Sequence, residues 1–180
     1  FHGKTVSSCV LSTAPHVSVV FMRLPDGGLS SLWSTEFGPP FWVSPVASLA
    51  SVDNAYSVTK AEAITLIYDL IADFRPALIG TQDGSLAYGD DHQDHMASGL
   101  MVMEASFRYA EPLAYRIFRG YNIYGNWFTI PSPEPENLSL AEYAEKVRVM
   151  EAYGGAFPVD GDFDRWCHRQ YSVSRVLSGN

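Results

Sequence analysis

Three stretches of the chain carry apolar residues at every third or fourth position, which is the spacing of one helix face. Two of them open with capping-box spacing, at Thr59-Lys60-Ala61-Glu62 and at Ser139-Leu140-Ala141-Glu142. Pro76 follows the first stretch and Gly154-Gly155 follows the third, as expected of residues that end helices. We therefore predict amphipathic helices over residues 59–74, 96–110 and 139–153.

Other stretches have the composition of strands. The residues from Val17 to Leu24 are mostly apolar and run into the turn sequence Pro25-Asp26-Gly27-Gly28, which predicts a buried strand that ends in a tight loop. Leu78-Ile79 predicts a short buried strand, and the aromatic segment from Tyr115 to Tyr124 predicts an edge strand. Helices between strands are typical of a parallel βαβ layer, so the predicted fold class is α/β.

The length and composition favour one folded domain over residues 1–180. A content of 47% hydrophobic and 18% charged residues is enough to bury a core and excludes a disordered chain. No uninterrupted apolar run approaches the roughly 20 residues that span a bilayer, so we expect no transmembrane segment. The net charge of -8 argues against nucleic acid as a partner.

The two cysteines, Cys9 and Cys167, lack the spacing of a metal finger. They are either two free thiols or one disulfide, and a disulfide would require an oxidising compartment. Asn137-Leu138-Ser139 is a glycosylation sequon, although such tripeptides also arise by chance. Together these features favour a secreted or extracellular protein over a cytoplasmic one.

The region from Leu29 to Asn54 is rich in serine, proline and glycine and has no sustained period. Trp33, Phe37, Phe41 and Trp42 are scattered through it. A long loop fixed by aromatic side chains suggests a binding role. The alternative is that the aromatics only fill a shallow core under the loop.

The densest chemistry lies in Gly89-Asp90-Asp91-His92-Gln93-Asp94-His95, which combines two imidazoles with three carboxylates. The stretch lies between a predicted strand and a predicted helix, where α/β proteins hold ligands. One imidazole could bind a metal while the other acts as an acid or electrostatic stabiliser, and Asp91 or Asp94 could orient a ring. The alternative is a solvated acidic loop in which Asp94 caps the helix and both histidines are exposed.

Further short stretches accompany this motif in a characteristic order. They are Val20-Phe21-Met22-Arg23-Leu24-Pro25-Asp26-Gly27, Tyr56-Ser57-Val58-Thr59, Pro76-Ala77-Leu78-Ile79, Asp91-His92-Gln93-Asp94-His95, Gly120-Tyr121, Asn137-Leu138-Ser139, Lys146 and Arg169-Gln170-Tyr171. In this order the chain resembles, over nearly its whole length, the GlcNAc-phosphatidylinositol de-N-acetylase family, also called PIG-L or LmbE-like. The resemblance implies a Rossmann-like three-layer α/β domain with a mostly parallel sheet.

The same resemblance implies a zinc-dependent hydrolase that removes an acyl group, with acetyl expected, from an N-acylated amino sugar in a glycan, glycolipid or glycoside. By position in the His-x-Asp-His motif, His95 would be a zinc ligand. His92 would stabilise the oxyanion or protonate the leaving amine, and Asp94 would orient His92. The substrate-binding candidates are Arg23, Asp26, Trp42, Tyr88 and Tyr121.

One family motif is missing, because no His-x-Asp-Asp precedes His92. In the family that motif supplies the other two zinc ligands and the general base. We therefore expect these residues to be the carboxyl-terminal part of the catalytic domain, whose sheet is incomplete without an upstream segment. An associated segment or chain would carry the His-x-Asp-Asp motif. The alternative is a non-catalytic, sugar-binding or structural remnant of the same fold.

Overall fold

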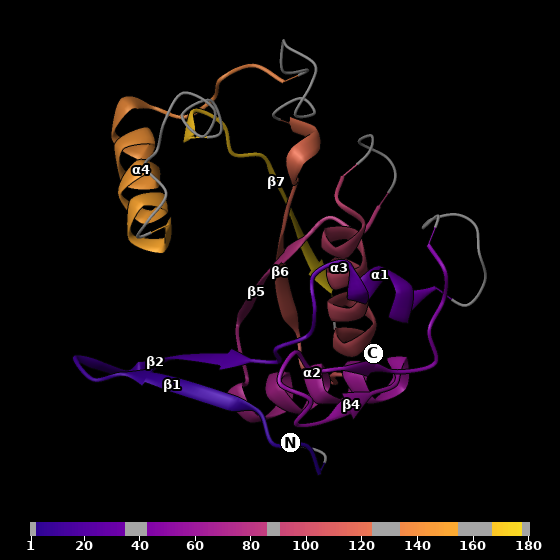
Figure 1. Ribbon diagram of the computed structural model, residues 1–180. Coiled ribbons are helices and arrows are strands. Elements are labelled where there is room, and N and C mark those ends of the chain that lie inside the picture. Colours follow the sequence, from indigo (N-terminus) through magenta and orange to yellow (C-terminus); the bar gives the residue numbers. More distant parts are fainter. Residues whose placement is uncertain (1–2, 35–42, 86–90, 124–133, 155–166, 178–180) are drawn as a thin grey trace.

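The structure is a computed structural model that describes residues 3–34, 43–85, 91–123, 134–154 and 167–177 (Figure 1). Over these ranges the chain is a mixed α/β protein. The helices are α1 (Gly28–Trp33), α2 (Lys60–Phe74), α3 (Gln93–Phe107), α4 (Leu140–Gly154) and the short 3₁₀ helix η1 (Tyr121–Ile123). The strands are β1 (Ser7–Leu11), β2 (Ala14–Phe21), β3 (Leu49–Ala50), β4 (Ser57–Val58), β5 (Leu78–Gln82), β6 (Leu113–Phe118) and β7 (Ser172–Leu177).

The main sheet has the strand order β5-β6-β7. β5 pairs with β6 in parallel, and β7 pairs with β6 antiparallel, with Phe118 opposite Ser172. The carboxyl ends of β5 and β6 therefore meet the amino end of β7 at one edge of the sheet. The edge strand predicted from Tyr115 to Tyr124 is strand only up to Phe118, and β6 is central instead of at an edge, because β5 and β7 pair with its two sides. Its Leu113, Tyr115 and Ile117 are buried in the core.

The core lies between one face of this sheet and the helices α2 and α3. Alternate residues of β6 are buried, as a strand with one covered face requires. Gly99 lets α3 approach β5 closely, because a Cβ at this position would overlap with the carbonyl oxygen of Gln82. The unit β5-α3-β6 is thus a parallel βαβ layer, as the sequence predicted.

The three predicted helices are confirmed. Thr59 caps α2 with the reciprocal bonds of a capping box, in which the Glu62 carboxylate accepts from the Thr59 backbone N–H at 2.8 Å. Ser139 and Glu142 make the same pair before α4. The region predicted as an unbroken loop from Leu29 onwards contains most of α1 and also β3, and its residues 35–42 lie outside the described part.

The strand predicted from Val17 to Leu24 exists, but its expected burial is wrong. β2 pairs with β1 in an antiparallel hairpin that is separate from the main sheet. Its apolar side chains remain open to solvent, with Val19 50% and Phe21 45% exposed. The two strands satisfy each other's backbone hydrogen bonds, but they cannot cover their own apolar side chains. In the described part of the chain, no helix or sheet packs over this apolar face of the hairpin.

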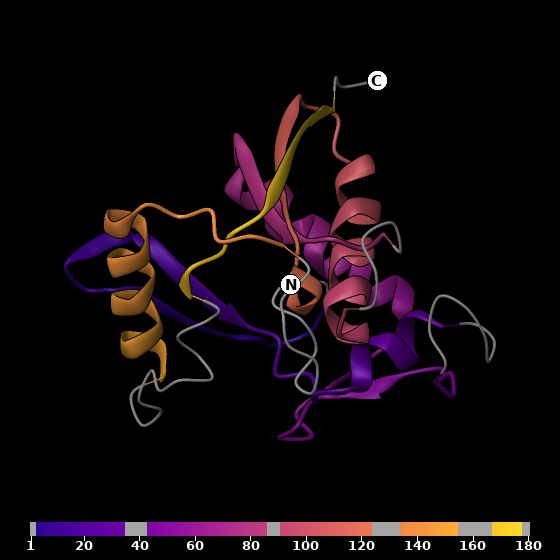
Figure 2. The same ribbon diagram turned by 90° about the horizontal axis from the view of Figure 1, so that it is seen from above.

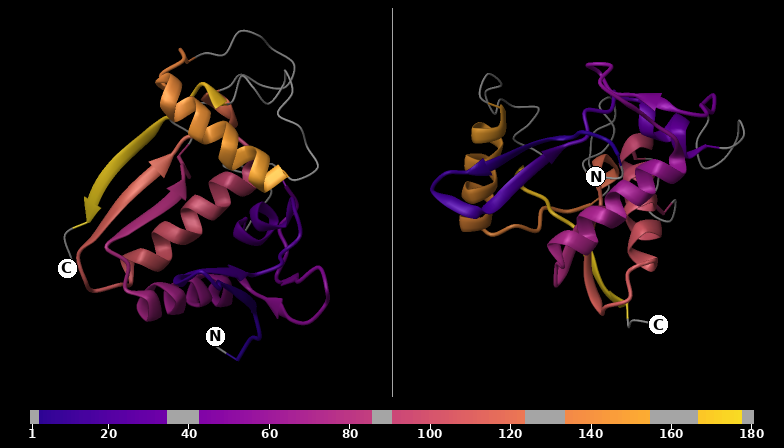
Figure 3. Two further views of the ribbon diagram at one scale, coloured as in Figure 1. Left: turned by 90° about the vertical axis from the view of Figure 1, so that its left-hand side faces the viewer. Right: turned by 90° about the horizontal axis from the view of Figure 1, so that it is seen from below.

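The hairpin and α4 lie on the side of the sheet opposite α3 and α1 (Figures 1 and 2). Figure 3 shows α4 crossing the upper part of the molecule while the hairpin runs above α2. α4 is anchored by the segment before β7, since the Tyr143 ring stacks on the His168 ring at 4.2 Å and Lys146 Nζ donates to the carbonyl of Arg169.

Two expectations about compartment and membrane can be compared with the structure. Cys9 is exposed, Cys167 is buried, and both are free thiols. The Asn137 side chain of the sequon is exposed and pairs reciprocally with the backbone of Gln170, at 2.8 and 2.9 Å. Among the described helices, none has the length and apolar character needed to cross a membrane.

Candidate functional site

The His-x-Asp-His motif forms the amino-terminal end of α3. The helix begins at Gln93, three residues earlier than predicted, because His92 is its N-cap. The Nδ1 atom of His92 accepts a hydrogen bond from the backbone N–H of Asp94 at 3.3 Å. In the alternative of a solvated loop, the choice of Asp94 as the cap is therefore wrong, whereas His92 is exposed as that alternative expects.

Two imidazoles and a phenol come together at this helix end. The ring centroids of His92 and His95 are 5.3 Å apart, and the ring of Tyr121 lies 4.7 Å from His95 and 6.4 Å from His92. Tyr121 comes from η1, just after β6, so the carboxyl-terminal edge of the sheet brings it to the motif. Burial and the negative charges of Asp91 and Asp26 raise the pKa of Tyr121.

Asp91 places a buried carboxylate in the site, since its side chain is only 5% exposed. Its Oδ1 atom accepts from the His92 backbone at 2.7 Å, from the Tyr121 backbone at 2.9 Å and from the Nδ1 atom of His95 at 3.1 Å. Burial raises the pKa of Asp91, but the hydrogen bonds from His95, Tyr121 and His92 outweigh it and leave that pKa below its usual value.

Asp94 joins the site to the first turn of α1. It is 8% exposed, and its Oδ1 accepts from the backbone N–H of Ser30 at 2.8 Å. Ser30 is itself buried, so this charge-assisted bond fixes the start of α3 against α1. The bond between Asp94 and His92 runs from the Asp94 backbone to the ring, and not from the carboxylate.

Asp26 lies next to both motif residues, although it is far away in the sequence. Asp26, His92 and Asp94 each offer one ligand atom, and these atoms lie within 4.8 Å of one another. Two carboxylates and an imidazole are ligands that divalent cations accept, so this group could hold a metal ion. His95 lies beside the group, but its Nδ1 is engaged by Asp91.

The other candidate substrate residues are distributed differently. Arg23 donates to Asp53 at 2.6 Å in an exposed ion pair. Asp26 and Tyr121 lie at the histidines. Trp42 and Tyr88 lie outside the described residues.

Two residues of the site were not among the predicted functional residues: Ser30 and Gly120. Asp91 was one of the two carboxylates expected to orient a ring, and its Oδ1 contacts Nδ1 of His95. Ser30 takes part through its backbone alone, and Gly120 through its missing side chain, because a Cβ there would overlap with the Asp91 carboxylate. Neither kind of role has a pattern in the sequence.

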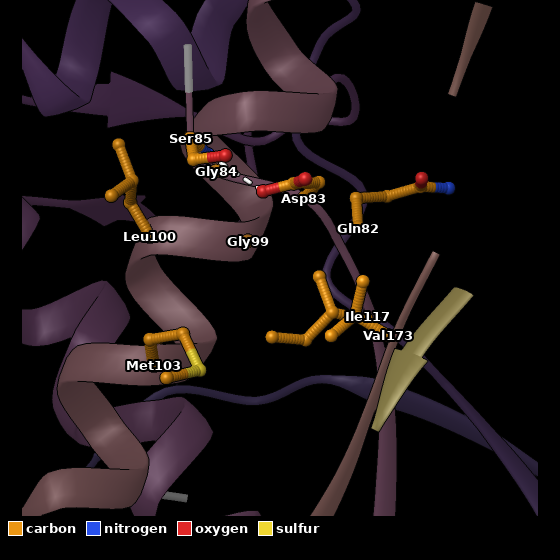
Figure 4. Close-up of a pocket in the computed structure, with 9 residues that line it drawn as sticks. All are labelled: Gln82, Asp83, Gly84, Ser85, Gly99, Leu100, Met103, Ile117 and Val173. Carbon is orange, nitrogen blue, oxygen red and sulfur yellow. Dashed lines mark hydrogen bonds between the residues drawn. The ribbon is translucent and has the colours of Figure 1, made fainter. Parts of the chain in front are cut away.

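A cavity of about 230 Å³ begins one turn after His95 along α3. In Figure 4, Met103 of α3 lies on one side of it and Ile117 and Val173 on the other, while the Leu100 side chain points away from those two residues. The segment 82–85 at the end of β5 closes its top and brings the polar groups. The two motif histidines are not among the residues that line the cavity, so it is separate from the imidazole group.

Comparisons with known proteins give no relative for this chain. No family model, no curated protein and no solved structure matches it. The interpretation of the site therefore depends on its own geometry and on the residues quoted above.

Proposed function

We propose that this chain carries part of the active site of a zinc-dependent hydrolase that removes an acyl group, with acetyl expected, from N-acylated amino sugars. The main support is that the ring centroids of His92 and His95 are 5.3 Å apart. The carboxylates of Asp26, Asp91 and Asp94 lie around these two rings. Amide hydrolysis needs a metal or base to activate water and a cationic or hydrogen-bonding group for the developing oxyanion. Imidazoles beside carboxylates can provide both.

His95 is the zinc ligand in this proposal. The donor set fits the metal, because zinc takes neutral imidazole nitrogens and carboxylate oxygens. A hydrogen bond from Nδ1 to a carboxylate is also what metal-binding histidines commonly make, and His95 makes one to Asp91. Zinc, when bound, lowers the pKa of a water molecule to about 7 and polarises the amide carbonyl.

His92 is the residue that stabilises the oxyanion or protonates the leaving amine in this proposal. It is exposed, so a substrate can reach its ring. Its Nδ1 accepts from the backbone of Asp94, which leaves Nε2–H as the donor toward the substrate. Asp94 and Asp26 lie beside the ring, with ligand atoms of all three residues within 4.8 Å of one another.

Tyr121 and Asp26 would contact the sugar. The Tyr121 ring lies beside His95 and offers a flat apolar surface with a polar tip, which suits a pyranose ring. Asp26 is exposed and can accept hydrogen bonds from hydroxyl groups. Trp42 and Tyr88 remain proposals for the same role.

The remaining zinc ligands and the general base would come from an associated segment that carries a His-x-Asp-Asp motif. Two features support this. The described part of the sheet ends at β5, whose outer edge has no partner strand in that part, and the parallel unit β5-α3-β6 is a building block of Rossmann-like sheets. A strand added beside β5 would end near the imidazoles.

The test is the zinc content of three variants of the native protein, together with deacetylation of an N-acetylglucosamine glycoside. His95→Ala should lose zinc and activity, whereas His92→Ala and Asp26→Asn should keep zinc. The opposite pattern would place the metal in the Asp26, His92 and Asp94 group and overturn the residue roles. Zinc-free, inactive native protein would favour the non-catalytic remnant.

A further inference from the structure

We infer that Asp91 is the positioning residue of His95, and that Gly120 is required because it leaves room for the Asp91 carboxylate. The inference deepens the proposed function and rests on it in one respect, namely that His95 binds the metal. Asp91 would touch neither metal nor substrate. It would act by deciding which nitrogen of His95 is free and where that nitrogen lies.

The first step concerns the His95 ring. A carboxylate oxygen accepts hydrogen bonds, so the 3.1 Å contact between Oδ1 of Asp91 and Nδ1 of His95 requires the proton to lie on Nδ1. In a neutral imidazole the lone pair for a cation is then on Nε2. The Tyr121 ring, 4.7 Å away, limits the rotation of the imidazole on its other side.

The second step concerns what holds Asp91. One oxygen atom, Oδ1, accepts three donors from different places: the backbone of His92, the ring of His95 and the backbone of Tyr121. The first two belong to the start of α3, and the third follows β6. The orientation of His95 is therefore set by the edge of the sheet as well as by its own helix.

The third step concerns the other oxygen. Oδ2 of Asp91 is buried and has no hydrogen-bond partner in the described part of the chain. It lies against Gly120, where a Cβ would overlap with it. A methyl group at position 120 must therefore displace the carboxylate, and the His95 ring would lose its acceptor although Gly120 does not contact that ring.

The experiment compares Asp91→Asn and Gly120→Ala with Gly80→Ala as the matched control. Gly80 lies on β5 of the same sheet, and a Cβ there would meet only Phe118, at an ordinary 3.4 Å. Zinc affinity is measured on the native protein by competition with a chelator. The tautomer of His95 is read from ring ¹⁵N chemical shifts of the zinc-free protein, with His95→Gln to assign the signals.

Wild type and Gly80→Ala should show the His95 proton on Nδ1. Asp91→Asn and Gly120→Ala should bind zinc 10–100-fold more weakly, the loss expected for an outer partner of a metal ligand. Their spectra should show a smaller share of the Nδ1–H tautomer, because Gly120→Ala displaces the acceptor and the neutral amide oxygen of Asp91→Asn accepts more weakly than a carboxylate. Asp91→Asn keeps the shape and an acceptor oxygen, so it should stay folded even where Gly120→Ala does not.

Unchanged zinc affinity and an unchanged tautomer in Asp91→Asn would overturn the inference while the proposed function stands, provided His95→Ala has lost the metal. If His95→Ala keeps full zinc, the proposed function fails instead. The tautomer result would still report whether Asp91 orients the ring.

Discussion

At the scale of single residues, the grouping of imidazoles and carboxylates was predictable from the sequence, but their hydrogen-bond partners were not. Two histidines and several aspartates in one short run indicated a metal or acid–base site, and the structure brings them together. Which carboxylate serves which ring depends on where α3 begins and on the backbone of Tyr121. As a result Asp91 holds His95, whereas the Asp94 carboxylate bonds to Ser30.

Replacing His92 should separate chemistry from metal binding. We expect His92→Ala to retain zinc and to lower kcat by about 10²–10³, the size of losing one oxyanion stabiliser. Asp94→Asn, which keeps an acceptor for Ser30, should lower kcat less. Steady-state kinetics with parallel metal analysis check this, and full activity of zinc-loaded His92→Ala would show that its ring takes no part in the reaction.

The Arg23–Asp53 pair allows a pH prediction away from the site. Hydrogen bonds from Ser51 and Arg23 lower the pKa of Asp53 from 3.8 to about 2. Because the folded pKa is depressed, the stabilisation from this carboxylate is present above pH 3.8 and is lost as the pH falls through about 2.

An NMR titration of the Asp53 carboxyl carbon should show this midpoint, and Ser51→Ala should raise it. A midpoint at the ordinary value in the unaltered protein would show that the pair does not form in solution.

At the scale of elements, helices were predictable and strand environments were not. Caps and apolar stripes are local signals, so the sequence predicted α2, α3 and α4 within about three residues. Burial of a strand depends on what lies over it, which no local pattern contains. β2 was predicted to be buried and is exposed, whereas β6 was predicted to be an edge strand and is central.

The capping box of α2 should contribute measurably to stability. Thr59→Ala removes the side chain that accepts from the Glu62 backbone N–H, so we expect a loss of about 1 kcal/mol in the free energy of unfolding. Thr65→Ala in the same helix removes a hydroxyl that only bonds back to Ala61.

That control should be neutral or stabilising, since alanine is the better helix former. Denaturant unfolding of both variants decides the question, and equal losses would contradict a specific role for the cap.

At the scale of the whole molecule, the described part of the chain leaves apolar surface exposed on one side. The apolar face of the β1–β2 hairpin is open, Leu78 on β5 is 52% exposed, and α4 stands away from the sheet (Figure 2). The composition indicated enough apolar residues for a core. It could not indicate which apolar residues are buried in that core and which stay exposed on the surface.

If an associated segment completes the sheet, the outward backbone amides of β5 should exchange slowly in the native protein. In the 180-residue chain prepared alone, the same amides should exchange rapidly, because an edge strand leaves them to water. Hydrogen exchange with mass spectrometry compares the two samples. Rapid exchange in both would mean that no strand pairs with β5, and the source of the missing ligands would have to lie elsewhere.

The placement of β6 between β5 and β7 also affects the order of events during synthesis. β5 is available before β6 emerges, but the last residue of β7 follows the end of β6 about 60 positions later, which is roughly 3–12 s at ordinary translation rates. During that interval the edge of β6 that will pair with β7 has no partner. Tyr121, which contacts the motif histidine His95, follows directly after this strand. The nascent chain is therefore exposed to mispairing at the same edge of the sheet that later holds the candidate site.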